Sequence, residues 1–247
     1  MITERYYIIM IEYPKIETLY KRSMTGDKSL IVGDYRNPVI EMLAKFNIWN
    51  AYEKLDGSNH QIFWDGHNIN LYGRTDRSNI TNPILDYFND KFNNIETEEL
   101  FEQLFGDKQY IFYFEAIGNK IQSCGKYYGD NPRFVLLDVY NVNNNSWWSY
   151  GNSSDIIPNQ FTINSIAKAL NVECKQLIMK GTLDDFVDYI QTVPLSTFTK
   201  EDGPNYPMEG IVAVPNIELK DSNGDRVIVK IKCCDHIKNF KQILKNY

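Results

Sequence analysis

The sequence has no long hydrophobic run. None of its apolar stretches reaches the roughly 18 residues that a membrane-spanning helix requires. The N-terminal stretch "MITERYYIIMIEYPK" places charge before a short β-rich run and has no small-residue cleavage site, so we interpret it as a first strand and not as a signal peptide. These absences predict a protein without a membrane partner.

Metal-ligand spacings and an excess of positive charge are also missing. The histidines are His60, His67 and His236, and the cysteines are Cys124, Cys174, Cys233 and Cys234. They form neither a C-x-x-C motif nor a zinc spacing, which favours reduced thiols in a cytoplasmic compartment. The net charge of −6 gives no global attraction for nucleic acid, so any such binding requires a local basic groove.

Strand and helix patterns occur along the chain, and no repeat and no linker-like shift in composition separates them. β-rich stretches predict strands over 5–13, 51–55, 109–118, 133–142, 146–150, 208–215 and 226–234, and a hairpin over 60–75. Amphipathic spacing predicts helices over 82–92, 97–106, 162–170, 182–191 and a short basic one over 235–245. This order predicts a single α+β domain over 1–247, with antiparallel sheets flanked by helices.

The stretch "YEKLDGSN" presents a lysine, Lys54, beside an Asp56-Gly57 turn signal. A tight turn between two strands explains the stretch without any chemistry. The alternative is a covalent nucleophile, because a lysine amine attacks once burial or a neighbouring cation favours its neutral form. This alternative predicts further cations and metal-binding carboxylates elsewhere in the chain.

Such residues follow in order along the sequence. Arg74 lies in "YGRTDR", Glu115 interrupts an apolar strand, and Glu209 begins another. Lys230 and Lys232 are two residues apart and therefore share one face of a strand. Each alone is explained by a solvated face or an edge charge. Together they predict a phosphate site, with the carboxylates holding Mg²⁺.

The ordered set "EKLDGSN", "YGRTD", "YFEAIG", "GDNPRFVLLDVY", "EGIV" and "VKIK" resembles the six motifs of the covalent nucleotidyltransferases. That superfamily contains DNA ligases, RNA ligases and mRNA capping enzymes. The stretch "IQSCGKYYGDNPRFVLLDVY" is similar to the RNA ligase 2 family, which includes the trypanosome RNA-editing ligases. The resemblance implies a nucleotidyltransferase (ATP-grasp-like ligase) fold and an ATP-dependent RNA ligase with Mg²⁺ or Mn²⁺.

The resemblance also implies a role for each matching residue. Lys54 would carry the AMP, Lys230 and Lys232 would contact the α-phosphate, and Glu209 would place the metal. The nucleotide would be bound by Glu53 at the adenine edge through its backbone, Asn59 near the phosphate, Arg74 at the ribose and phosphate, Glu115 at a ribose hydroxyl, and Phe134 stacked on adenine.

The resemblance would place an OB-fold or a C-terminal RNA ligase domain after "VKIKCC", and we expect neither in this protein. We expect a minimal ligase acting on RNA ends or nicked duplex, or one that a separate partner protein supplements. The rival interpretations are a capping guanylyltransferase, a DNA ligase core and a non-catalytic nucleotide- or RNA-binding homologue.

Overall fold

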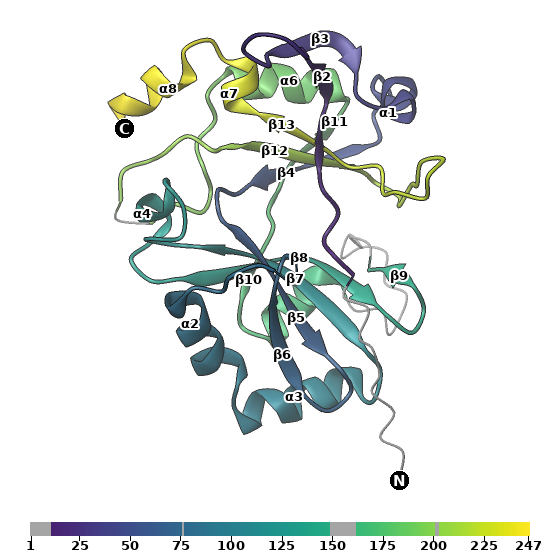
Figure 1. Ribbon diagram of the computed structural model, residues 1–247, viewed down its shortest axis with the longest axis vertical. Coiled ribbons are helices and arrows are strands. Elements are labelled where there is room, and N and C mark those ends of the chain that lie inside the picture. The colour runs from purple at the N-terminus through teal and green to yellow at the C-terminus, as the bar shows by residue number, and fades with distance from the viewer. Residues whose placement is uncertain (1–10, 76, 149–161, 201–202) are drawn as a thin grey trace.

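Two large β-sheets face each other in the computed structural model, which describes residues 11–75, 77–148, 162–200 and 203–247 (Figure 1). The first sheet has the strand order β1 (Glu17–Thr18), β13 (Val229–Lys232), β12 (Gly210–Pro215), β4 (Trp49–Lys54) and β11 (Leu177–Gly181). All its pairings are antiparallel except that of β1 with β13.

The second sheet lies below the first in Figure 1. Its order is β10 (Glu173–Cys174), β8 (Arg133–Asn141), β7 (Tyr110–Ile117), β5 (Ser58–Trp64) and β6 (Ile69–Gly73), and β9 (Ser146–Trp147) pairs with β8. The apolar strands β7 and β8 are central, as their composition predicts. A separate hairpin joins β2 (Tyr20–Arg22) to β3 (Leu30–Tyr35).

Helices cover the outer face of each sheet. The helices are α1 (Pro38–Leu43), α2 (Asn82–Phe92), α3 (Ile95–Phe105), α4 (Gly125–Tyr128), α5 (Ile163–Ala169), α6 (Leu183–Gln191), α7 (Cys233–His236) and α8 (Phe240–Ile243), followed by the 3-10 turn η1 (Leu244–Asn246). One core packs α2, α3 and α5 on the second sheet, and another packs α1, α6 and α8 on the first. The inner faces therefore remain available for a site between the sheets.

The predicted α+β class with antiparallel sheets and flanking helices is confirmed. Helix α6 begins with the capping box of Thr182 and Asp185 that the sequence indicates. Helix α3 begins at Ile95 instead of Thr97, because the Asn94 side chain accepts the Thr97 amide and so caps it two residues earlier. Of the predicted terminal strand, 5–10 lie outside the described residues, and 11–13 form no strand.

The predicted helix over 235–245 is wrong. The chain leaves helix α7 through an extended Ile237 and then takes a left-handed turn at Asn239, where φ is 59°. Helix α8 starts only after this turn, and its first residue, Phe240, is 6% exposed within the core of the first sheet. The chain therefore bends here and buries Phe240, and the predicted continuous amphipathic helix does not form.

A buried charge network joins the two sheets at one end of the gap between them. Asp138 on β8 accepts hydrogen bonds from Tyr13 Oη at 2.6 Å, Lys175 Nζ at 2.9 Å and Arg226 Nη1 at 3.3 Å. Burial opposes ionisation of Asp138, but the two cations outweigh it and hold its pKa below the ordinary value. Because Lys175 leads into β11 and Arg226 into β13, this network fixes how the sheets face each other.

Candidate active site

A cavity of about 310 Å³ lies between the inner faces of the two sheets. The first sheet contributes Tyr52, Glu53, Lys54, Val212 and Lys230, the second contributes Asn59, Arg74, Glu115 and Leu137, and the N-terminal segment contributes Tyr13 to Ile16. Six of the nine predicted site residues therefore line one cavity, although they are spread over some 180 positions: Glu53, Lys54, Asn59, Arg74, Glu115 and Lys230.

Lys54 ends strand β4, and its ammonium group is held by Glu209. Lys54 Nζ lies 2.6 Å from Glu209 Oε2, and the other carboxylate oxygen lies 2.5 Å from Lys232 Nζ. Each of the three side chains is only about one-fifth to one-quarter exposed. Glu209 thus links the predicted nucleophile, Lys54, to the predicted phosphate-binding Lys232 at the edge of the cavity.

Two glycines make this close arrangement sterically possible. Gly210 pairs with both Lys54 and Lys232, and a Cβ at this position would lie 2.3 Å from the carbonyl oxygen of Ile231. Gly57 follows the nucleophile turn, and a Cβ there would lie 2.3 Å from the Ala116 oxygen and 2.8 Å from Glu115 Cγ. The glycine of the turn motif therefore has a steric role, because it lets the turn after Lys54 lie against β7.

The lysines on β13 raise the positive potential at the same end. Lys230 and Lys232 share the inner face of the strand, as their spacing predicts. Burial lowers the pKa of Lys230, and the charges of Lys54 and Lys232 lower it further. The three ammonium groups are therefore close enough to repel one another, and they would be stabilised by an anionic ligand such as a phosphate.

Glu115 faces these lysines from the second sheet. Burial raises its pKa to about 7, an effect that Lys54 reduces and Glu209 reinforces. Strand pairing places Glu115 opposite Asn59, and the two side chains are hydrogen-bonded. The Asn59 side-chain amide also donates to the Phe114 carbonyl oxygen at 3.3 Å. A carboxyl group that titrates near neutrality fits a role at ligand hydroxyls better than a purely structural one.

The substitution Glu115→Gln is expected to stabilise the protein at pH 8 and much less at pH 5. The folded-state pKa, about 7, exceeds the unfolded value of 4.5, so stability present at low pH is lost as the pH rises through this window. Removal of the charge should recover about 1–3 kcal/mol of unfolding free energy at pH 8. Denaturant unfolding at both pH values measures this, with Glu99→Gln on α3 as control. An equal effect of Glu115→Gln at both pH values contradicts the assignment.

The remaining polar residues take different orientations. The Glu53 carboxylate points away from Lys54 and accepts hydrogen bonds from both the amide and the hydroxyl of Thr197, each at 2.8 Å. Only the backbone of Glu53 is thus presented to the cavity, in keeping with the contact expected of it. Arg74 is exposed at the end of β6, and no carboxylate of the described residues pairs with it.

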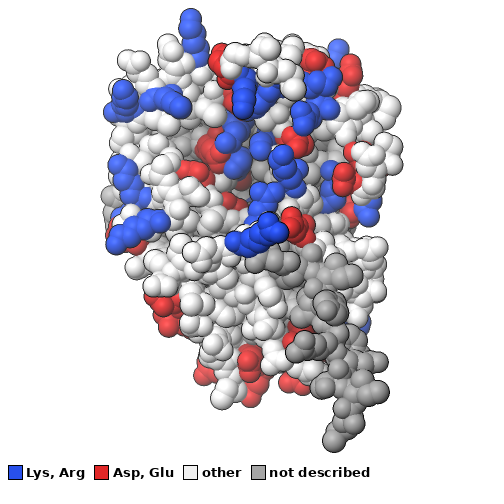
Figure 2. Space-filling view, viewed as in Figure 1, with Lys and Arg blue, Asp and Glu red and all other residues white. Residues whose placement is uncertain are grey.

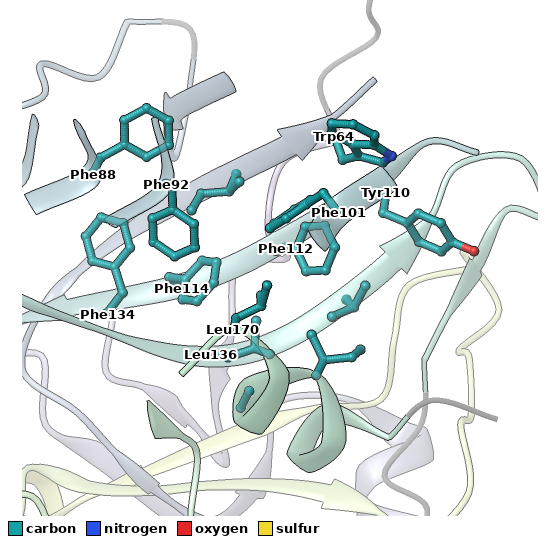
Figure 3. Packing of buried hydrophobic residues seen from close by; sticks show 14 of the residues in the cluster. Trp64, Phe88, Phe92, Phe101, Tyr110, Phe112, Phe114, Phe134, Leu136 and Leu170 are labelled. Carbon is teal, nitrogen blue, oxygen red and sulfur yellow. The ribbon is translucent and has the colours of Figure 1, made fainter. Parts of the chain in front are cut away.

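The expected stacking of Phe134 on the nucleotide base is contradicted by the structure. Phe134 is 1% exposed and packs with Phe92 and Phe114 in the core beneath α2 (Figure 3). It shares the face of Phe114 and Ala116, opposite to that of Glu115, because side chains alternate along a strand. In β8 the side chain that lines the cavity is Leu137, beside an irregularity in the pairing with β7.

Phe134→Leu is therefore expected to lower stability by up to about 1.5 kcal/mol and to leave the KM for the nucleotide unchanged. A stacking role would instead cost about 1–3 kcal/mol of nucleotide binding. Leu137→Ala is the matched variant and should raise the KM. Thermal unfolding and initial rates at varied nucleotide concentration distinguish the two outcomes, and a raised KM in Phe134→Leu would restore the stacking role.

Several cavity residues have no signal in the sequence. Tyr13, Ile16 and Val212 read as ordinary strand residues, and Lys175 has no motif around it. Asp138, which contacts the cavity residues Tyr13 and Lys175, does have a signal, since an aspartate within the apolar run "FVLLDVY" is unusual and indicates a buried partner. Burial lowers the pKa of Lys175 to about 8 although Asp138 opposes this shift.

The surface charge is uneven around the cavity. Figure 2 shows Lys and Arg side chains gathered over the upper half of this face, where Figure 1 places the first sheet, while Asp and Glu predominate at the lower end near α2 and α3. The net charge of −6 therefore conceals a local basic surface.

The described residues contain no cluster of three or more His, Cys, Asp or Glu side chains suited to a metal ion. Glu209 at the edge of the cavity lies near Glu115, because its charge contributes to raising the pKa of Glu115. This set fits Mg²⁺ or Mn²⁺, since such ions are commonly held by one or two carboxylates together with phosphate oxygens of the substrate. In the same part of the chain, no helix has the length and apolar character needed to cross a bilayer.

Comparison with known proteins identifies relatives of the chain. A family model described as RNA ligase matches residues 47–232, which include every predicted site residue. No curated protein matches the sequence.

Solved structures share the fold. An RNA ligase variant from Naegleria gruberi with ATP and Mn aligns with a TM-score of 0.59 and 16% identity, over 96% of this chain and 59% of that one. Another variant without ligands gives a TM-score of 0.56 and 17% identity over 96% and 60%. A structure of that ligase with PPi gives 0.53 and 17% over 95% and 64%. This chain thus spans about three-fifths of the length of these proteins.

Proposed function

Since the chain belongs to the RNA ligase family, we propose that it is an ATP-dependent RNA ligase joining 5′-phosphate and 3′-hydroxyl ends through a lysyl–AMP intermediate. The observation that carries the proposal is the position of Lys54, which lies in a cavity with Lys230 and is ion-paired to Glu209. A turn between strands needs none of these neighbours. The fold shared with ATP-bound and AMP-bound RNA ligases supports the choice of nucleotide.

In the first step the Lys54 amine attacks the α-phosphorus of ATP. A nitrogen–phosphorus bond forms, Lys54 loses a proton, and the bond to the bridging oxygen breaks so that pyrophosphate leaves with its electron pair. Lys230 and Lys232 offset the charge that develops on the phosphate oxygens. An ammonium group has no free electron pair, so Lys54 must give up its proton and its contact with Glu209 before it attacks.

Two further transfers at phosphorus complete the reaction. A 5′-phosphate oxygen of the RNA attacks the AMP phosphorus, and the bond to Lys54 nitrogen breaks, which gives a pyrophosphate-linked end. A 3′-hydroxyl then attacks the RNA 5′-phosphorus, loses its proton and releases AMP. Little covalent chemistry is required of the protein in these steps, so positioning and charge neutralisation by Arg74, Lys230 and Lys232 are its main contributions.

Glu209 is the residue we assign to a divalent cation, Mg²⁺ or Mn²⁺, together with substrate phosphate oxygens. The ion would supply positive charge opposite the transferring phosphate. Both oxygens of Glu209 contact lysines in the present structure, so these contacts must rearrange when a cation is held there.

RNA ends or nicked duplex are the proposed substrates, and the basic surface above the cavity supports this assignment. We also propose that part of the RNA-binding surface comes from a separate protein or segment, because the matched ligases are longer than this chain. The four free cysteines support a reducing, cytoplasmic compartment.

Incubation with ATP labelled at the α-phosphorus, with Mg²⁺ or Mn²⁺ and a denaturing gel, tests the function. We expect one labelled protein band with ATP, little with GTP, and loss of the label when a 5′-phosphorylated RNA is added. A band formed preferentially with GTP favours a capping guanylyltransferase. If neither nucleotide gives a labelled protein band, the proposed enzymatic function is contradicted.

A further inference from the structure

A second cavity, also of about 310 Å³, shares a wall with the nucleotide cavity. Asn59 and Arg74 line both, so the two cavities adjoin at these side chains. The rest of the second cavity is formed by Ser58, His60, Ser78, Asn79, Thr81, Ile84, Ile121 and Gln122, from the start of β5, the segment before α2 and the segment before α4.

The lining of the second cavity is polar but almost uncharged. Hydroxyl and amide side chains predominate over an apolar floor of Ile84 and Ile121. Burial lowers the pKa of His60 to about 4, so its imidazole is neutral at physiological pH. Among the described lining residues Arg74 thus carries the one formal charge, at the wall shared with the nucleotide cavity. This composition suits a sugar with several hydroxyls and an adjoining phosphate.

The shared wall has unused hydrogen-bonding capacity. Asn59 Oδ1 is buried without a hydrogen-bond partner. Elsewhere in the lining of the second cavity, the exposed side chains of Asn79 and Gln122 make no hydrogen bond with protein groups of the described residues. Buried polar groups are normally paired, so an acceptor such as Asn59 Oδ1 indicates a ligand or water at this wall.

We propose that the second cavity binds the terminal ribonucleotide of an RNA end and reads its 2′-hydroxyl through Asn79 and Gln122. The inference rests on the proposed ligase function and adds the position of the RNA. AMP transfer joins the RNA 5′-phosphate directly to the phosphate on Lys54, and sealing then brings the 3′-hydroxyl of the other end to the RNA 5′-phosphorus, which is one bridging oxygen away from the AMP phosphorus. A nucleotide adjoining that phosphate must therefore lie next to the nucleotide cavity, and the wall of Asn59 and Arg74 leads into the second one.

Asn79→Ala and Gln122→Ala test the proposal, because neither removes a hydrogen bond of the described structure. Gln103→Ala, on the exposed side of α3, is the matched control, because the Gln103 side chain also makes no hydrogen bond in the described structure. Preformed, labelled enzyme–AMP is chased with an all-RNA nicked duplex, or with duplexes that carry one 2′-deoxynucleotide at either the 5′-phosphate or the 3′-hydroxyl terminus. The rates of AMP transfer and of joining are recorded separately from the rate of self-adenylylation.

We expect both variants to self-adenylylate within twofold of the wild type and to transfer AMP or join ends at least tenfold more slowly on all-RNA. On the wild type, a 2′-deoxynucleotide at one of the two termini should slow AMP transfer or joining to a similar extent. The rates of the two variants should not change with this deoxy substitution. The terminus at which the wild type is sensitive identifies the nucleotide that the cavity binds. Equal sensitivity of wild type and variants, or insensitivity of the wild type at both termini, overturns the proposal. Failure of the wild type to self-adenylylate instead overturns the proposed function.

Discussion

Lys54→Ala is expected to abolish the covalent adenylate completely. Lys54 is the amine at the end of β4 that both lines the nucleotide cavity and contacts Glu209, and a phosphoramidate requires such a nitrogen nucleophile. Lys230 and Lys232 extend from β13, a different strand, and are expected to bind the phosphate and not to replace the nucleophile. The expected loss is therefore total instead of partial.

Lys54→Arg should be equally inactive although it preserves the positive charge. A guanidinium stays protonated in proteins and has no free electron pair to attack phosphorus. The measurement is protein label on a denaturing gel after incubation with α-labelled ATP. Lys108→Ala, an exposed lysine before β7, should retain full labelling. Label on either Lys54 variant would move the nucleophile to another residue.

Glu209→Ala is expected to give the second largest effect, a loss of about 10²–10³ in the rate of self-adenylylation. The substitution removes the proposed cation ligand and the carboxylate that orients Lys54 and Lys232 at 2.6 and 2.5 Å. Lys54 and Lys232 are then left without their shared carboxylate partner. Because their side chains remain 22% and 27% exposed, water can still solvate them, and the melting temperature should change little.

Initial rates over a range of Mg²⁺ and Mn²⁺ concentrations, alongside thermal unfolding, separate these effects. A role at the cation predicts that the lost activity of Glu209→Ala recovers in part at higher metal concentration. Glu102→Ala on the exposed side of α3 is the control. A large fall in melting temperature together with an unchanged rate per folded molecule would make Glu209 a structural residue.

Local patterns in the sequence determined most of the regular elements. Period-two alternation and strong apolar runs located β4, β5, β7, β8 and β12, and Thr-x-x-Asp identified the start of α6. These signals depend on interactions between residues that are a few positions apart. Such interactions form largely independently of the tertiary fold. Very short elements such as β1, β10 and α4 have too few residues to show a period, and the sequence did not indicate them. The longer α1, β3 and β11 were not predicted either.

The lysine, arginine and carboxylate members of the site were also accessible from the sequence. Lys54, Glu115, Glu209 and the lysines of β13 are charged residues in or beside apolar strands, where a charge costs free energy unless it has a partner or a function. The types of these residues and their order along the chain are therefore sufficient to indicate chemistry at phosphorus.

Only the tertiary structure decided which side of the second sheet faces the nucleotide cavity. Phe134 and Leu137 belong to one apolar run, and from the sequence we expect the base contact at Phe134. The irregular pairing of β8 with β7 and the helices packed beneath the sheet place Phe134 in the core and Leu137 at the cavity. The Asp138 network and the second cavity likewise unite residues far apart in the chain, because their positions follow from how the sheets pack, and no local pattern encodes that.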